Sequence, residues 1–534
     1  MTTINTLNEI PMDDLKEEER KEMERKEMEK KEKEKKDKKK DSGSVSTFSD
    51  SNSGKENEPD KQKAPNDPNQ EFSPQYYQEA EFVSPYNNPF LVFVDKYFNI
   101  SKRNSNFTTE ILAGITLFLT TSYILQKQTT ILGIAGMDSQ SVFTATALTT
   151  GLGTITIGLV SGFPMLISTG MGENFFFVDT ICHTLGYDWK IGLSLVFFHG
   201  IISVILSIVI PKSNLIYAIP STFRIGIAYG IGLLIGKIGI IDMLLLDTSS
   251  HFDPKYQALI GGLTLVLIVY GASRNHKLVV VLGVIGSVVL SIIISIARKD
   301  LSFPKWVTPS LKETAFKLKF DYRNAVPIYY VIVYVLNTLF DVVCSSLTII
   351  QLTFLSKIKY DNESFVKLVA GAKNNRFMKI LLVNSAFVIV SSLLGTSPTV
   401  IFIESCVAAA LGARTGLCSI VAGLLFIISI FFYPIMMIIP QESIGPLLVW
   451  TTISVLQMVE YMNFDDINEM IPVAISSVLI PLLDSVIYGV SSGYIVLLLV
   501  WITGKNRKWK QINATMIFVG IASIICLFIP KTFS

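Results

Sequence analysis

Long apolar blocks dominate the pattern of hydrophobic and polar positions after residue 103. Most of them run for about 15–25 residues, which is the length that a helix needs to cross a bilayer. The pattern therefore predicts an all-α polytopic membrane protein with fourteen spans. We place these spans at 109–133, 142–161, 164–183, 191–210, 222–243, 257–271, 277–297, 326–350, 377–394, 397–412, 417–439, 443–460, 470–485 and 487–503.

A polar stretch at 297–324 divides the spans into two sets of seven. Because each set has an odd number of spans, the second set starts on the opposite side of the membrane, and the halves form a seven-plus-seven inverted repeat. One further apolar stretch, 514–530, follows the last span, and the pattern does not decide whether it crosses the membrane.

Two apolar segments are interrupted by proline and glycine at membrane depth, and each stands third in its half. They are FPMLISTGMGENFFF (163–177) in span 3 and LGTSPTVIFIESCVAAALGARTG (394–416) in span 10. Irregular backbone inside a bilayer persists only where protein buries it or where it lines a cavity. Broken segments at matching positions of two halves indicate the binding site of a transporter. We predict that PMLIST and TSPTVI pair as short strands and that ESCVAAALGA forms a short helix.

Composition agrees with a membrane protein, since 50% of the residues are hydrophobic and the mean hydropathy is +0.46. Charged residues crowd into the first 103 positions. We expect a disordered, charged cytoplasmic tail at 1–95, a transporter domain at 96–503, and a basic segment with an apolar tail at 504–534. The five cysteines lie in apolar segments without metal-ligand spacing. We predict that the protein has no metal site. We also predict that it is not an enzyme, needs no cofactor and has no nucleic-acid partner.

Basic residues indicate the orientation. Lys96, Lys102 and Arg103 precede the first span, and most other basic loops fall on the same side of the predicted membrane. The positive-inside rule places this side, and with it the N-terminus, in the cytoplasm. The basic stretch at 297–324 falls on the opposite side, where its length and amphipathic pattern predict a segment that lies along the surface.

Two acidic residues within the predicted spans are the main candidates for function. Asp341 in span 8 shares one helical face with Asn337, Ser345 and Thr348. Glu404 stands where the short helix of span 10 begins, and a helix N-terminus favours a carboxylate. A charged side chain in a membrane is costly and is functional by default. The alternative is a structural pairing with another span. Both carboxylates could accept hydrogen bonds from a flat, N–H-rich ligand, and either could exchange a proton.

A third acid, Glu173, follows the Gly-Met-Gly turn of span 3. It is either a third carboxylate of the site or the ion-pair partner of Lys127 in span 1, and the sequence leaves both interpretations open. Lys127 ends a polar stripe that also contains Thr116, Thr120 and Tyr123. The neighbouring Asn174 and Phe175 are weaker candidates, because an aromatic ring there either stacks on a planar ligand or packs against other spans.

Several segments resemble one known family, the AzgA-like purine permeases of the nucleobase–ascorbate transporter superfamily. They occur in the family's order across 109–503. The matching segments are AGITLFLTTSYIL (113–125), STGMGENFFF (168–177), AIPSTFRIGIAYGIGL (218–233), LFDVVCS (339–345), LLGTSPTVIFIES (393–405) and GARTGL (412–417).

The resemblance implies a core domain of spans 1–4 and 8–11 and a gate domain of spans 5–7 and 12–14. It implies uptake of adenine, guanine or hypoxanthine by proton symport with elevator-type alternating access, in the plasma membrane, with a homodimer as a candidate assembly. Asp341 and Glu404 correspond to the base-binding carboxylates and are the candidates for proton coupling. The full predicted binding set is Asp341, Glu404, Thr396, Ser397, Gly172, Glu173, Asn174, Phe175, Thr120 and Tyr123.

The chain departs from the family pattern on the side of spans 1 and 3. Glu173 stands where relatives have a small or apolar residue, Asn337 replaces an aspartate, and Gln128-Thr129 replaces Asn-Pro. Two alternative functions remain. A sulfate-type anion transporter of the same architecture is favoured only by Lys127 and opposed by the two carboxylates. A non-transporting membrane scaffold or receptor would not depend on Glu404.

Overall fold

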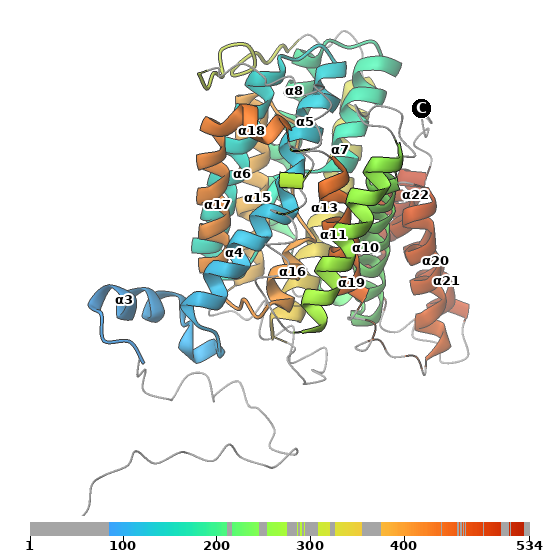
Figure 1. Ribbon diagram of the computed structural model, residues 1–534. Coiled ribbons are helices and arrows are strands. Elements are labelled where there is room, and N and C mark those ends of the chain that lie inside the picture. Colours follow the sequence, from blue (N-terminus) through green and yellow to red (C-terminus); the bar gives the residue numbers. More distant parts are fainter. Residues whose placement is uncertain are drawn as a thin grey trace, which may run out of the picture. The chain divides into compact units, whose positions relative to one another are not determined.

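A computed structural model of the chain describes residues 85–210, 216–244, 254–274, 308–320, 326–354, 375–438, 441–456, 466–483, 485–503 and 514–527, with a few isolated positions between them. Most of the predicted tail and most of the predicted span at 277–297 lie outside these residues. The described chain is mainly helical and contains two short strands (Figure 1). By length and composition, seven of the described helices can cross a membrane.

The first half follows the predicted spans with one interruption. A single helix was expected at 109–133, but it is interrupted at Ser122, where the hydroxyls of Thr121 and Ser122 donate to carbonyls three or four residues earlier. The elements are α3 (Pro89–Phe98), α4 (Phe107–Thr121), α5 (Tyr123–Ile134), α6 (Ser139–Ser161), β1 (Ile167–Thr169), α7 (Met171–Phe175), a π-helix (Phe176–Thr184), α8 (Trp189–Val209), α10 (Ser221–Leu244) and α11 (Pro254–Ser273).

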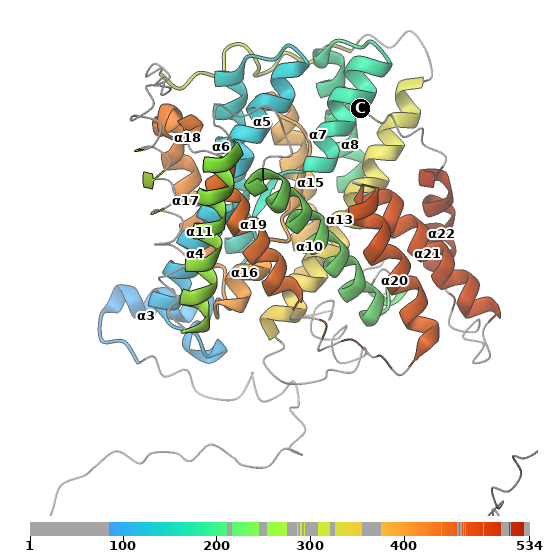
Figure 2. The same cartoon turned by 45° about the vertical axis from the view of Figure 1, so that its right-hand side comes forward.

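The second half repeats this order of elements around its own broken segment. Its elements are α13 (Val326–Phe354), α15 (Arg376–Leu394), β2 (Thr399–Ile401), α16 (Ser405–Ala410), α17 (Leu417–Ser429), a 3₁₀ turn (Ile430–Phe432), α18 (Tyr433–Ile438), α19 (Gln441–Leu456), α20 (Ile467–Leu482), α21 (Val486–Thr503) and α22 (Ala514–Leu527). Helix α10 packs beside α19 and α20 (Figure 2). The apolar stretch predicted at 514–530 contains α22, which packs against α21 and α13.

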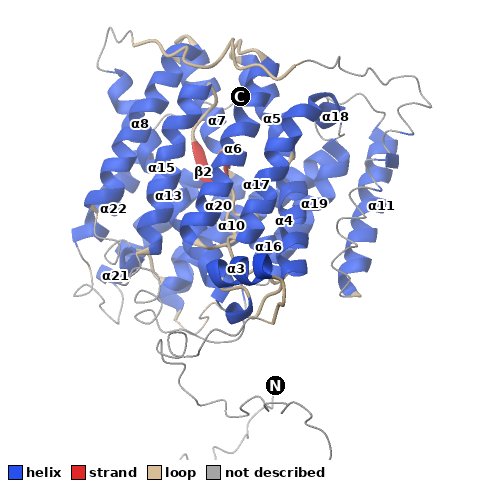
Figure 3. Ribbon diagram, turned by 90° about the vertical axis from the view of Figure 1, so that its left-hand side faces the viewer, coloured by secondary structure: helices blue, strands red, loops and turns tan. Residues whose placement is uncertain are grey.

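The two broken segments meet as predicted. Strands β1 and β2 pair antiparallel, with Ser168 opposite Val400, and lie among the helices (Figure 3). The backbone pairing continues beyond the strands, because Gly170 donates to the carbonyl of Pro398 at 3.1 Å and Phe402 donates to that of Leu166 at 2.9 Å. The prediction of short strands in spans 3 and 10 is confirmed.

Polar side chains from neighbouring helices satisfy the remaining backbone groups of the broken segments. Thr154 of α6 donates to the carbonyl of Ile167 at 3.1 Å, and Asn384 of α15 donates to the carbonyl of Thr399 at 3.2 Å. The amide of Leu166 donates to Ser405 at 3.0 Å. These bonds explain how irregular backbone is tolerated at this depth, where water is scarce.

The linker between the halves is irregular over residues 308–320 and lies beside three helix ends. Phe316 donates to the carbonyl of Leu393 at the end of α15, and Lys319 donates to that of Lys190 at the start of α8. Gln140 at the start of α6 donates to the carbonyl of Thr308 at 2.6 Å. This part of the predicted surface segment therefore lies along one end of the helices.

Two glycine pairs bring α6 and α17 into close contact. A methyl group placed on Gly423 would lie 2.7 Å from the carbonyl oxygen of Gly151, and one placed on Gly158 would lie 2.7 Å from that of Gly416. Small residues allow membrane helices to approach at backbone distance. Gly151 and Gly158 thus serve the close packing of α6 against α17.

We expect Gly423→Ala to lower the stability of the folded protein by about 1–3 kcal/mol, because the new methyl group would overlap backbone atoms that have little room to move. Gly262→Ala is the matched control, since a methyl group there meets nothing within 4 Å. Thermal unfolding of both variants in the same detergent checks this. Equal melting temperatures would contradict the glycine contact.

Candidate substrate site

The site forms where the two short helices begin, beside the paired strands. Gly170 caps the N-terminus of α7, and Glu404 caps that of α16. A side chain at Gly170 would overlap the carboxylate of Glu173, which lies over the start of α7. Of the Gly-Met-Gly segment, Gly170 is the N-cap residue and Met171 and Gly172 begin α7; the absence of a side chain at Gly170 leaves the space that the Glu173 carboxylate occupies.

Glu404 is buried, with 3% of its surface exposed, and accepts a hydrogen bond from the hydroxyl of Tyr123 at 2.9 Å. Tyr123 is the first residue of α5, directly after the interruption at Ser122. The structure thus brings together two predicted site residues from spans 1 and 10. A tyrosine hydroxyl uses only part of the acceptor capacity of a carboxylate, which has about four lone-pair sites.

Lys127 forms its ion pair with Asp242 of α10, at 3.1 Å. Glu173 instead accepts a hydrogen bond from the side-chain amide of Asn337 at 3.3 Å. The interpretation of Glu173 as the partner of Lys127 is therefore wrong. Asp242 lies in a different predicted span, and no local sequence pattern indicates the pair.

Asp341 stands one helical turn after Asn337 and accepts a hydrogen bond from Ser345 at 2.8 Å. It lies close enough to Glu173 and to Glu404 for the charges to interact. We call the part of the protein that holds Glu173 of α7, Asp341 of α13 and Glu404 at the start of α16 the carboxylate region; each of the three accepts a hydrogen bond from a neutral side chain.

Four further polar residues form a closed network between α5, α7 and the segment before β2. The amide nitrogen of Gln128 donates to Thr396 at 3.0 Å and to Ser397 at 2.8 Å. Asn174 donates to the Gln128 oxygen, and Ser397 donates to the Asn174 oxygen. The predicted site residues Thr396, Ser397 and Asn174 are thus close together but bonded to one another. Gln128 was not among the predicted site residues, although a glutamine inside an apolar span was a signal for it.

The remaining predicted residues differ in exposure. The hydroxyl of Thr120 is buried and donates to the carbonyl of Leu117 at 3.0 Å within its own helix. Gly172 and Phe175 lie on the exposed side of α7, and Phe175 is 49% exposed. Thr120 therefore supports the helix, whereas Gly172 and Phe175 face away from the closed network.

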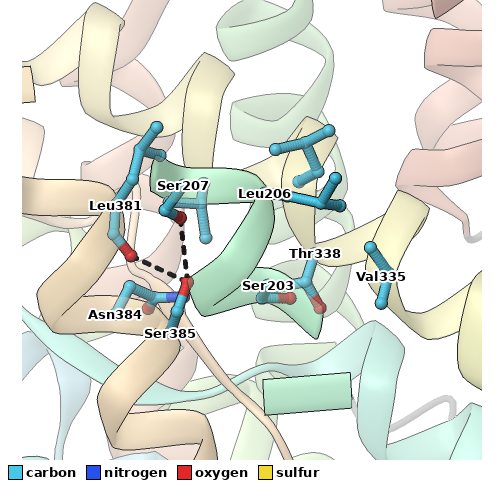
Figure 4. A pocket seen from close by; sticks show the side chains of 10 residues that line it. Ser203, Leu206, Ser207, Val335, Thr338, Leu381, Asn384 and Ser385 are labelled. Carbon is cyan, nitrogen blue, oxygen red and sulfur yellow. Dashed lines mark hydrogen bonds between the residues drawn. The ribbon is translucent and has the colours of Figure 1, made fainter. Parts of the chain in front are cut away.

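A separate small cavity lies between α8, α13 and α15, with a volume of about 20 Å³ (Figure 4). Ser207 and Ser385 bond to each other across it at 3.2 Å. Thr338 and Asn384 also line it. This volume suits a water molecule and is too small for a planar heterocycle. The carboxylate region, not this cavity, is therefore the candidate substrate site.

Comparison with known proteins agrees with this architecture. A family model described as "Permease family" (Xan_ur_permease) matches residues 108–487. The chain belongs to this permease family. It is 31% identical over 441 residues to a protein of Methanocaldococcus jannaschii that is named as a permease, covering 79% of this chain and 95% of that one.

The names of two bacterial relatives state a substrate. The permease is 28% identical to adenine permease AdeP of Escherichia coli, over 81% of this chain and 95% of that one. It is 28% identical to guanine/hypoxanthine permease PbuO of Bacillus subtilis, over 81% of this chain and 100% of that one. Among solved structures, the transmembrane domain of a cyanobacterial bicarbonate transporter, BicA, is similar at 15% identity with a TM-score of 0.46, covering 71% of this chain and 96% of that one. The family match and the seven described helices that are long and apolar enough to cross a membrane identify the permease as a multi-pass membrane transporter.

Proposed function

We propose that the permease takes up purine nucleobases such as adenine, guanine and hypoxanthine. The observation that carries this proposal is the group of carboxylates Glu404, Asp341 and Glu173, which accept hydrogen bonds from neutral side chains. Adenine and guanine/hypoxanthine are the substrates in the names of two relatives that match most of the chain. Purine bases present ring and exocyclic N–H groups, which carboxylates accept in short, charge-assisted hydrogen bonds.

The geometry suggests distinct roles for the residues around the base. Glu404 and Asp341 would accept its N–H groups, and Tyr123 would hold Glu404 in place. The network of Gln128, Asn174 and Ser397 would fix the start of α7 relative to β2. Side chains that are already held by hydrogen bonds to other residues lose little conformational entropy when the ligand binds.

Burying several carboxylates together with a neutral base is costly unless a proton accompanies the base. We therefore propose proton symport, with Asp341 or Glu404 as the group that takes up the proton. The ion pair between α5 and α10 crosses the predicted boundary between core and gate. An ion pair between the two predicted domains fits an elevator-type movement of one domain against the other. We further propose that the permease lies in the plasma membrane with its N-terminus in the cytoplasm.

An anion transporter of the same architecture is less well supported. Lys127 was the residue that favoured an anion, and it is bonded to Asp242. An anion at the start of α16 would instead meet the carboxylate of Glu404, and like charges in a medium of low dielectric constant repel strongly. A scaffold would not require Glu404.

The test is uptake of labelled adenine and labelled guanine by the full-length permease in cells that lack their own purine uptake. We expect uptake that excess unlabelled purine competes away and that excess sulfate or bicarbonate leaves unchanged. Cells carrying the empty vector give the background. Inhibition by sulfate without inhibition by purines would favour the anion function, and absence of adenine and guanine uptake at normal membrane abundance would contradict the purine proposal.

A further inference from the structure

Helix α3, which precedes the first span, carries an exposed aromatic face. Phe90 is 69% exposed, Phe93 is 66% exposed and Tyr97 is 54% exposed. Their spacing of three and four residues places the three rings on one side of the helix. Asp95 and Phe98 face the opposite side and are buried. A contiguous aromatic patch of this kind marks a surface that meets an apolar partner.

Specific contacts fix the place of α3. The carboxylate of Asp95 accepts from the backbone and the hydroxyl of Ser101, at 2.9 and 2.7 Å. The hydroxyl of Tyr97 donates to the carbonyl of Leu159, near the end of α6, at 3.4 Å. Arg103 donates to the carbonyl of Gly162, just after α6, at 2.6 Å. The helix is therefore held at the end of α6, beside the start of α4.

This position determines which partner α3 can meet. Helix α6 and the combined α4 and α5 are long and apolar enough to cross a membrane, so their ends mark the membrane boundary. Helix α3 runs crosswise to α4 and α6 (Figures 1 and 2). Leu159 and Val160, at the end of α6, are 42% and 40% exposed and continue the apolar surface beside Tyr97.

We propose that α3 lies in the interfacial plane of the bilayer, with Phe90, Phe93 and Tyr97 inserted at the boundary between headgroups and acyl chains. Amphipathic helices with aromatic residues on the apolar side bind membranes in this way, and aromatic rings gather at membrane interfaces. The exposed Lys96 and the half-buried Lys102 lie in and just after the helix, where they meet lipid phosphates. Helix α3 thus anchors the entry of the chain into its first span.

Spin labels on single cysteines in a cysteine-free, full-length permease test this proposal in vesicles of phosphatidylcholine and phosphatidylglycerol. Labels at 90, 93 and 97 are expected to collide with oxygen more often than with a water-soluble nickel complex. A label at the exposed Lys312, in the irregular linker, is the water-facing control. Nickel accessibility at 93 equal to that at 312 would overturn the proposal. Strong spin–spin broadening at 93 would also overturn it, because a second copy of the chain would then cover the face.

A stability measurement distinguishes lipid contact from a passive helix. In the same vesicles, Phe93→Asp is expected to lower the melting temperature by about 2–4 °C. Phe93→Trp is the matched variant and should leave the temperature unchanged, since tryptophan suits the interface as well as phenylalanine does. Equal melting temperatures for Phe93→Asp and the unaltered permease would contradict the insertion of this face.

Discussion

Replacing Glu404 by glutamine is expected to reduce purine uptake by about 10- to 100-fold at normal membrane abundance. Glutamine keeps the size of the side chain but removes the negative charge, and a hydrogen bond to a charged group contributes roughly 1.5–3 kcal/mol. Each 1.4 kcal/mol corresponds to about a tenfold change. Asp341→Asn should have an effect of similar size, because Asp341 shares the region and the proposed proton. Initial uptake rates over a range of purine concentrations measure both losses.

Glu110→Gln is the matched control for this experiment. Glu110 is as deeply buried as Glu404, but it lies near the start of α4 and accepts from the backbone of Arg414 at 2.8 Å, outside the carboxylate region. Its uptake per molecule should stay near that of the unaltered permease. Normal uptake in either Glu404→Gln or Asp341→Asn would overturn the site assignment, whereas a loss in Glu110→Gln as well would point to a general effect of buried acids on folding.

Replacing Lys127 by methionine is expected to destabilise the permease more than replacing Asp242 by asparagine. Breaking a buried ion pair from one side costs about 3–5 kcal/mol, because the remaining charge stays buried and loses the attraction of its oppositely charged neighbour. The side chain of Asp242 is 4% exposed and that of Lys127 is 18% exposed. The aspartate therefore has less access to water once its ammonium partner is gone. We expect a loss of roughly 3 kcal/mol for Lys127→Met, the lower end of that range.

The double variant Lys127→Met with Asp242→Asn completes the experiment. It should recover most of the stability, because neither neutral side chain leaves a buried charge. Denaturation of all four proteins in the same detergent gives the interaction between the two sites. If the loss of stability in the double variant equals the sum of the losses in the two single variants, the ion pair contributes nothing to stability. If domains move against each other during transport, the double variant should also change the rate of uptake, because the pair joins α5 to α10.

The sequence contained enough information for the broken segments but not for the pairing of side chains. Pro164 and Pro398, together with β-branched neighbours, disfavour helix at fixed places, and this local effect predicted β1 and β2 correctly. The partner of Lys127 was not predictable in the same way. Asp242 lies 115 positions further along the chain, and their contact depends on how α5 and α10 pack.

The interruption of span 1 and the closed network share one physical cause. Hydroxyl and amide side chains bond to whatever polar group lies near, and hydropathy patterns do not encode that choice. Thr121 bonds to its own helix, whereas Gln128 joins Asn174 and Ser397 from two other elements. The sequence therefore showed which polar residues lie within the predicted spans. It did not show which of their polar atoms are already bonded within the protein and which remain available for a ligand.

The pairing of β1 with β2 imposes an order on the synthesis of the protein. Val400 leaves the ribosome 232 residues after Ser168, its partner in the register. At roughly 5–20 residues per second, the backbone of the first broken segment waits about 10–50 s for its strand partner. During that time its polar groups have no strand to bond, and lipid offers no substitute. The first half of the chain must therefore stay sheltered from the bilayer, by the insertion machinery or by its own helices, until the second half arrives.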